Sequence, residues 1–167
     1  SLPISTVVEL DIDSMKLGIL SEMENPRAYL SMAFYPDCLM FIGGTNCWSS
    51  VYGITEKYDL LEHQWYKCKK LNYPRYGHGN CTINERYIFV TGGCDRFYDI
   101  MNCELYDRKY DRWTEYSSML KPVQKCNVLK FHDDIFVVGG KERNVQIFNY
   151  ERKFWRFGPK LNDITSK

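Results

Sequence analysis

Short apolar segments separated by polar turns follow one another along the whole chain. Apolar and polar residues tend to alternate within these segments, as in a β-strand with one buried face, and no stretch shows the helical period of about 3.6 residues. The sequence therefore predicts an all-β chain in which polar turns join neighbouring antiparallel strands. The predicted strands cover 27–34, 39–42, 54–58 and a segment from 65; 75–83, 87–91, 103–106 and 113–116; and a segment from 122, then 135–138, 145–148 and 155–157.

One arrangement of residues occurs three times. In each copy a strand ends in a pair of glycines, a strand with an aromatic residue follows, and a tryptophan stands seven residues beyond that aromatic residue. Pro26, Pro74 and Pro122 recur at intervals of 48 residues, so the fixed offsets indicate an internal repeat. The repeated positions are Gly43, Gly44, Tyr58 and Trp65; Gly92, Gly93, Tyr106 and Trp113; and Gly139, Gly140, Phe148 and Trp155.

Each copy holds four predicted strands, the pattern of a four-stranded antiparallel meander. A single meander buries too little apolar surface to be stable, so the copies are expected to stack. We expect each tryptophan to occupy the same pocket and wedge against the neighbouring sheet, and each glycine pair to permit a close approach that a Cβ atom would block. The units are predicted at 25–70, 73–118 and 121–160 of a single repeat region, 1–167, with 7–20 as the outer half of a preceding unit and 161–167 as the start of a further one.

Composition narrows the classes of function. Aromatic residues make up 16% of the chain, which favours β-structure, and the formal net charge of +1 argues against a nucleic-acid-binding surface. The longest apolar runs are far shorter than the roughly 20 residues needed to span a bilayer. The first residues lack the basic and apolar regions of a secretory signal. We therefore expect a cytoplasmic protein without nucleic-acid or membrane partners.

The cysteines and histidines give no pattern of a metal or catalytic centre. The seven cysteines include no Cys-x-x-Cys motif and no histidine at zinc-ligand spacing, so we expect reduced thiols and no metal. His63, His78 and His132 fall at unequal positions in the repeat and are not expected to meet. No Gly-x-Ser-x-Gly motif, phosphate-binding loop or paired-carboxylate motif is present. The prediction is a protein with no enzymatic activity, no catalytic residue and no cofactor.

The repeated pattern resembles the kelch repeat, which forms one blade of a β-propeller. The segment 75–79, Arg-Tyr-Gly-His-Gly, is similar to the Arg-x-Gly-x-Gly motif that opens an inner strand in this family. The resemblance covers residues from about 7 to 162 and implies a partial kelch-type propeller with three full four-stranded antiparallel blades and an N-terminal half blade. The third copy departs from the pattern at Val123-Gln124 and at Phe148-Asn149.

Kelch propellers generally have more blades than the three and a half predicted for this chain. We expect either a segment or truncated remnant of a longer BTB–Kelch-like protein, or a chain that covers its open blade faces by self-association or in a compact four-unit ring. The richness in Tyr, Asn, Lys, Ile and Cys is similar to that of the poxvirus branch of BTB–Kelch proteins. That narrower resemblance implies a role in host–virus interaction.

In the kelch family, loops on one face of the propeller hold a peptide or protein partner. Carried over by position, the loops between blades supply Arg27, Arg75 and Tyr76. Arginines and large aromatic residues dominate the energetics of many protein interfaces. The loops that follow the glycine pairs supply Thr45, Asn46, Trp48 and Tyr52; Asp95, Arg96, Phe97 and Tyr98; and Lys141, Arg143 and Asn144.

The resemblance implies a protein–protein interaction module, the substrate-recognition part of a cullin-based ubiquitin-ligase adaptor of the BTB–Kelch type. Actin or cytoskeletal binding is one alternative, and a degraded fragment with little activity of its own is another. A third alternative is the copper oxidase chemistry of some kelch-like propellers. It needs imidazole and phenolate ligands around one ion, and the unequal positions of the three histidines argue against it.

Overall fold

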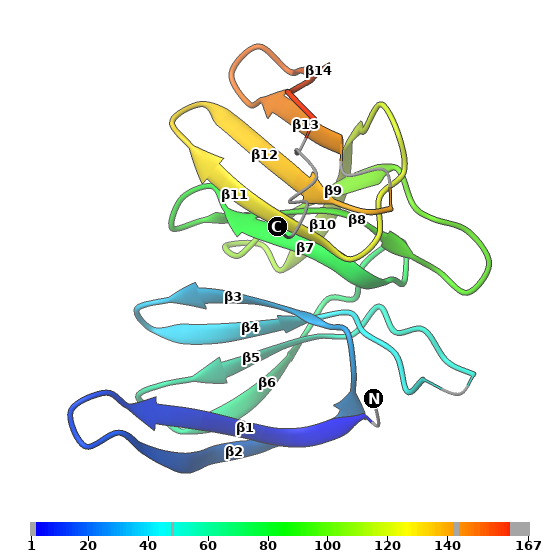
Figure 1. Cartoon of the computed structure of the whole chain (residues 1–167). Coiled ribbons are helices and arrows are strands. Elements are labelled where there is room, and N and C mark those ends of the chain that lie inside the picture. The colour runs from blue at the N-terminus through cyan, green and yellow to red at the C-terminus, as the bar shows by residue number, and fades with distance from the viewer. Residues whose placement is uncertain (1–2, 48, 142–143, 161–167) are drawn as a thin grey trace, which may run out of the picture.

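The computed structural model describes residues 3–47, 49–141 and 144–160 of the chain (Figure 1). Within these residues the chain is all-β, with fourteen strands and no helix, so the predicted fold class is confirmed. None of the described residues forms a helix that could cross a membrane. The strands are β1 (Ile4–Asp11), β2 (Lys16–Arg27), β3 (Ser31–Tyr35), β4 (Cys38–Ile42), β5 (Thr55–Asp59), β6 (Gln64–Cys68), β7 (Tyr76–Thr82), β8 (Tyr87–Cys94), β9 (Asn102–Asp107), β10 (Arg112–Ser118), β11 (Cys126–Phe131), β12 (Asp134–Gly139), β13 (Asn144–Asn149) and β14 (Phe154–Phe157).

The strands form three four-stranded antiparallel sheets and one two-stranded sheet. Strands β3 to β6 make the first full sheet, β7 to β10 the second and β11 to β14 the third, each paired in chain order. Strands β1 and β2 pair only with each other. Figure 1 shows the sheets following one another through the molecule, from the blue β1–β2 hairpin to the orange β13 and β14. This arrangement is the expected set of three blades and a half blade.

Two inner strands start later than the sequence pattern predicts. The strand predicted over 27–34 begins at Ser31, and Arg27 instead ends β2. The strand predicted from 122 begins at Cys126. In each case a left-handed residue close ahead of the strand interrupts the extended backbone: Tyr29, two residues before Ser31, has φ at 54°, and Lys125, directly before Cys126, has φ at 53°.

The three repeated tryptophans occupy equivalent positions, as predicted. Each indole lies against the aromatic residue of the adjacent strand, with ring centroids 5.1, 4.8 and 5.0 Å apart in the three blades. Each indole Nε1 also donates a hydrogen bond to the last strand of the preceding sheet or to the residue that follows it. The acceptors are Ser21 Oγ for Trp65, Lys69 O for Trp113 and Ser117 Oγ for Trp155. The tryptophans therefore join successive blades.

Apolar side chains fill the space between neighbouring sheets. Met40 and Ile42 of the first blade pack with Ile88 and Val90 of the second in one buried cluster. A second cluster joins the second and third blades, and a third joins the half blade to the first blade. Truncating a large side chain in such a core costs about 3–5 kcal/mol, so these clusters hold the array together.

The glycine pairs stand where one blade meets the opening of the next. Gly43 has φ at 62°, and a Cβ atom there would lie 2.5 Å from the backbone oxygen of Arg75. Gly92 has φ at 70°, and its Cβ atom would lie 2.4 Å from the backbone oxygen of Val123. Backbone atoms cannot yield that space, so the predicted need for glycine at the crowded inner rim is confirmed.

The cysteines form no disulfide bond within the described residues. Cys47 is exposed and Cys68 is half-buried, whereas the others are buried. Burial raises the pKa of the Cys103 thiol to about 12 and that of Cys126 to about 11. The buried cysteines therefore act as small apolar side chains between the blades.

Candidate functional site

The two ends of the blades differ in the connections that they carry. Short turns at 36–37, 60–63, 84–86, 108–111, 132–133 and 150–153 form one end, the turn face. The opposite end, the loop face, carries the longer connections within blades at 45–47, 49–53, 95–101 and 140–141, and the links between blades at 69–75 and 119–125. Figure 1 shows the cyan and green loops extending away from the sheets on the side opposite the hairpin turns.

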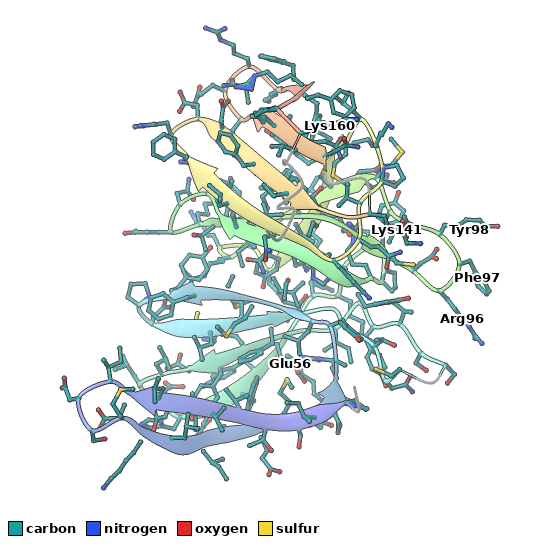
Figure 2. All side chains as sticks on the ribbon, viewed as in Figure 1. Glu56, Arg96, Phe97, Tyr98, Lys141 and Lys160 are labelled. Carbon is teal, nitrogen blue, oxygen red and sulfur yellow. The ribbon has the colours of Figure 1, made fainter. Side chains whose placement is uncertain are left out.

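The loop of the second blade presents an arginine and two aromatic residues to solvent. The Asp95 Oδ1 atom accepts hydrogen bonds from the backbone amides of Phe97 and Tyr98, each at 2.7 Å, and this closes the turn. Phe97 and Tyr98 are each 75% exposed, and the Arg96 guanidinium lies 5.7 Å from the Phe97 ring centroid. Figure 2 shows Arg96, Phe97 and Tyr98 projecting from the tip of this loop. We call residues 95–98 the aromatic finger.

The loop of the first blade is held by its own side chains. The Asn46 Oδ1 atom accepts hydrogen bonds from the amides of Ser49 and Ser50, at 3.0 and 2.9 Å. Thr45 is buried, and its hydroxyl donates to the Ser50 carbonyl oxygen. The half-buried Tyr52 donates its amide to Gly44 O. Asn46 therefore shapes the loop, and the predicted Trp48 lies outside the described residues.

The loop that carries the aromatic finger also contacts its neighbours on both sides. Arg96 Nη1 donates a hydrogen bond to Ser49 O in the first blade. On the other side, Gln124 Nε2 donates to Asp99 Oδ1, which ties the same loop to the third blade. Lys141 is exposed on the loop of the third blade, and Asn144, which begins β13, is half-buried. The predicted Arg143 lies outside the described residues.

Arg27 and Arg75 lie in the interior and not on the binding surface that the repeat pattern predicts. Both side chains are 0% exposed, and each forms an ion pair with a buried glutamate. Arg27 Nη2 lies 2.8 Å from Glu56 Oε2, and Arg75 Nη2 lies 3.0 Å from Glu104 Oε1. Neither guanidinium is accessible to a partner in this structure, because each is buried against a carboxylate, Glu56 in β5 or Glu104 in β9.

The Arg75 guanidinium joins three parts of the second blade. Its Nη1 atom donates to the backbone oxygens of Gly92 and Asn102, at 3.0 and 2.7 Å, and its Nε atom donates to Tyr73 O at 3.1 Å. Glu104 in turn accepts from the amide of Tyr73. Burial lowers the pKa of Arg75, and the Glu104 carboxylate opposes that shift. The pair fixes the link between blades to the glycine pair and to the start of β9.

The third blade replaces both members of this pair. Val123 stands where the other blades have arginine, and Gln146 stands where they have glutamate. The Gln146 side chain accepts from Lys121 N at 3.0 Å and donates to Lys121 O at 2.9 Å, so the amide still holds the link between blades. Both members of the pair change together, so no lone charge is buried.

Tyr76 and His78 lie at the start of β7, the inner strand of the second blade, directly after the buried Arg75. Tyr76 is half-buried, and its ring centroid lies 6.2 Å from that of Tyr29. His78 Nε2 and Ser31 Oγ form a hydrogen bond of 2.7 Å across two blades. Burial, together with the charge of Arg75, lowers the pKa of His78 to about 3, so this imidazole is neutral near neutral pH.

No group of histidine, cysteine and acidic residues within the described ranges could hold a metal ion. His63 contacts Tyr58, His78 contacts Ser31, and His132 packs on Phe131. The histidines therefore lie apart in three different surroundings. The absence of enzymatic activity stays a prediction.

The repeat pattern did not reveal a row of left-handed residues at the opening of the inner strands. Tyr29, Gly77 and Lys125 have φ at 54°, 62° and 53°, and they stand 48 residues apart. Gly77 N donates to Tyr29 O at 2.8 Å, and Lys125 N donates to Gly77 O at 2.6 Å. Gly77 of the Arg-x-Gly motif could have indicated these left-handed positions, because glycine readily adopts a positive φ. Its equivalents, Tyr29 and Lys125, lie 48 residues before and after it.

Stacked four-stranded antiparallel sheets with their longer connections gathered at one end are the blades of a β-propeller. No protein-family model matches the chain. It is similar to Alpha-scruin of Limulus polyphemus, with 27% identity over 95% of this chain and 18% of that protein. It is also similar to Kelch-like protein 26 of Danio rerio, with 31% identity over 59% of this chain and 18% of that protein. A kelch repeat and BTB domain-containing protein of Caenorhabditis elegans is 26% identical over 71% of this chain and 21% of its own length.

These similarities and the three repeated blades support the kelch-repeat propeller that the sequence pattern indicates. The chain spans about a fifth of the length of these relatives. The resemblance to the poxvirus branch stays a prediction.

Proposed function

We propose that the chain is a protein-interaction module that binds a partner peptide or protein through its loop face. The observation that carries the proposal is the aromatic finger, whose Phe97 and Tyr98 side chains are each 75% exposed on a turn closed by Asp95. Large aromatic side chains on an ordered turn offer a wide contact area at a small cost in conformational entropy. The adjacent Arg96 adds a donor for a carboxylate or carbonyl group of the partner.

The experiment compares proteins captured from a cell extract by three forms of the chain. The Phe97→Ala, Tyr98→Ala double variant removes the finger. Tyr110→Ala is the matched control, because Tyr110 is also an exposed tyrosine but lies on the turn face. We expect the double variant to lose the partners that the wild-type chain and Tyr110→Ala both retain. An unchanged partner set for the double variant would exclude the finger as the binding surface.

We further propose that the module recognises the substrate of a cullin-based ubiquitin ligase in the cytoplasm. The support is the similarity to a relative whose name includes a BTB domain. This chain would then compete with the longer adaptor for the substrate. Overexpression of the chain should lengthen the half-life of the captured partner, and the Phe97→Ala, Tyr98→Ala form should not. An equal half-life with both forms would contradict the adaptor role and leave the binding proposal standing.

A further inference from the structure

Two adjoining depressions, one at the loop face and one along the inner strands β3, β7 and β11, share Tyr29 and contain no carboxylate in their described lining. The first has a volume of about 290 Å³ and holds Tyr29, Tyr76 and Arg96 together with hydroxyl-bearing residues of the first loop. The second has a volume of about 530 Å³, and its lining includes Lys125 and polar side chains of the inner strands. Arg96 and Lys125 are the charged groups of this lining, since the pKa of His78 lies at about 3.

Neither Arg96 nor Lys125 forms an ion pair with a carboxylate of the described residues. Arg96 lies over the Phe97 ring, and Lys125 Nζ lies 5.8 Å from the Tyr29 ring centroid. Five other arginines do have a carboxylate partner: Arg27, Arg75, Arg86, Arg108 and Arg156. A depression about 630 Å³ in volume near the turn face contains Arg86 and Arg108, but their charges are already balanced in this way.

The nearest acidic residues of the same loop are engaged elsewhere. Asp95 Oδ1 holds the two amides of the aromatic finger, and Asp99 Oδ1 accepts from Gln124. Neither aspartate belongs to the lining of the two depressions, where Arg96 and Lys125 are the charged groups. Arginine and lysine beside tyrosine rings suit an anionic group attached to an apolar or aromatic one.

The backbone fixes Lys125 and Tyr29 in place. Both residues have φ near 54° although neither is glycine, and the hydrogen bonds from Lys125 to Gly77 and from Gly77 to Tyr29 hold this conformation across three blades. Gly77 lacks a side chain, so the space between Tyr29 and Lys125 stays open. Unfavourable backbone angles that are held by surrounding structure gather at functional sites.

We propose that these depressions bind an acidic peptide segment, whose carboxylates lie between Arg96 and Lys125 and whose apolar part lies on Tyr29 and Tyr76. The proposal rests on the binding function of the loop face and specifies the chemistry of its partner. The segment would enter beside the aromatic finger, which then covers it from one side. Charge complementarity of this kind selects partners and speeds their association.

A random-peptide display library panned against the whole chain tests the proposal. We expect the enriched peptides to be rich in Asp and Glu. A fluorescent synthetic copy of the most enriched peptide should bind Arg96→Glu and Lys125→Glu about tenfold more weakly than the wild-type chain in an anisotropy titration, and added salt should weaken binding to the wild-type chain. Lys153→Glu is the matched control, because Lys153 is also exposed with φ at 57° but lies on the turn face.

The outcomes separate this inference from the proposed function. Enriched peptides that are neutral or basic, and that lose binding in the Phe97→Ala, Tyr98→Ala variant, would overturn the acidic specificity and keep the loop face as a binding surface. Enrichment that no loop-face substitution affects, or no enrichment at all, would overturn both. If either charge-reversed form unfolds at a lower temperature than the wild-type chain, Arg96→Gln and Lys125→Gln replace them. Equal affinity of those neutral forms and the wild-type chain would also overturn the inference.

Discussion

Removing one member of the buried pair between Arg75 and Glu104 should destabilise the fold far more than replacing both members. Both side chains are 0% exposed, and the Arg75 guanidinium makes four hydrogen bonds, to Glu104, Gly92 O, Asn102 O and Tyr73 O. Arg75→Val leaves the Glu104 carboxylate buried without a cation. Breaking a buried ion pair in this way costs about 3–5 kcal/mol.

The third blade supplies the double replacement. Val123 and Gln146 occupy the positions of Arg75 and Glu104, and the Gln146 amide holds the preceding link through two hydrogen bonds to Lys121. Arg75→Val with Glu104→Gln buries no charge and keeps an acceptor for the link. We expect the double variant to lose only about 1–2 kcal/mol, mostly for the carbonyl oxygens that Arg75 no longer serves.

The assay is urea unfolding followed by circular dichroism, with the free energy of unfolding taken from the midpoint and slope. For a chain of this size 1 kcal/mol corresponds to about 2–4 °C, so Arg75→Val should also lower the melting temperature by about 10 °C. Arg112→Val is the control, since Arg112 is exposed and should change stability by less than about 0.5 kcal/mol. The reasoning fails if Arg75→Val matches the control, or if the double variant is no more stable than Arg75→Val.

Three further predictions concern the frame of the blades. Trp113→Ala should cost about 3–5 kcal/mol of unfolding free energy, because it empties a buried pocket and removes the hydrogen bond to Lys69 O; thermal unfolding within about 2 °C of wild type would contradict this. Gly92→Ala should cost more than about 1 kcal/mol in urea unfolding, because its Cβ atom would lie 2.4 Å from Val123 O at a φ of 70°; an unchanged midpoint would refute the strain. The hydrogen bonds from Arg86 lower the pKa of Asp107 below the usual 3.8, so its stabilising effect is present above that value and is lost as the pH falls. Asp107→Asn should therefore flatten the loss of stability below pH 3.8 in an acid-unfolding series, and an equal slope would exclude this role.

The parts of the fold that the sequence predicted follow from fixed offsets along one chain. A glycine pair, an aromatic residue and a tryptophan recur with strand-like spacing, and each sits where its own chemistry requires it. The Trp113 indole reaches the preceding blade, and Gly92 faces the backbone of the next one. Such features can be predicted from the sequence because the large indole or the missing Cβ atom itself meets the structural requirement at that position.

The burial of Arg27 and Arg75 could not be predicted from their place in a connection between blades. Each guanidinium turns inward because a carboxylate 29 residues later in the chain lies in the interior, at Glu56 of β5 or Glu104 of β9. An arginine in a loop position otherwise suggests a surface contact. The repeat did contain an indication of these ion pairs, because Glu56, Glu104 and Gln146 stand at one equivalent position.

The left-handed conformations of Tyr29 and Lys125 were hidden for a different reason. Residue type does not favour φ above zero at either position, so only the hydrogen bonds from neighbouring blades impose it. Gly77 adopts the same conformation at little cost and is the one residue type of the three that indicates it. Comparing equivalent positions across blades shows what one blade alone does not.

Two groups of cations in this chain differ in whether a buried glutamate lies within reach. Where the repeat places a carboxylate behind the loop, as at Glu56 and Glu104, the arginine is buried and joins two strands. Where it places none, as at Arg96 and Lys125, the cation stays at the surface beside an aromatic ring. Burial of an uncompensated charge is too costly for the second group to follow the first. The glutamates inside the blades therefore hold Arg27 and Arg75 in the interior, whereas Arg96 and Lys125 stay where the proposed acidic partner would meet them.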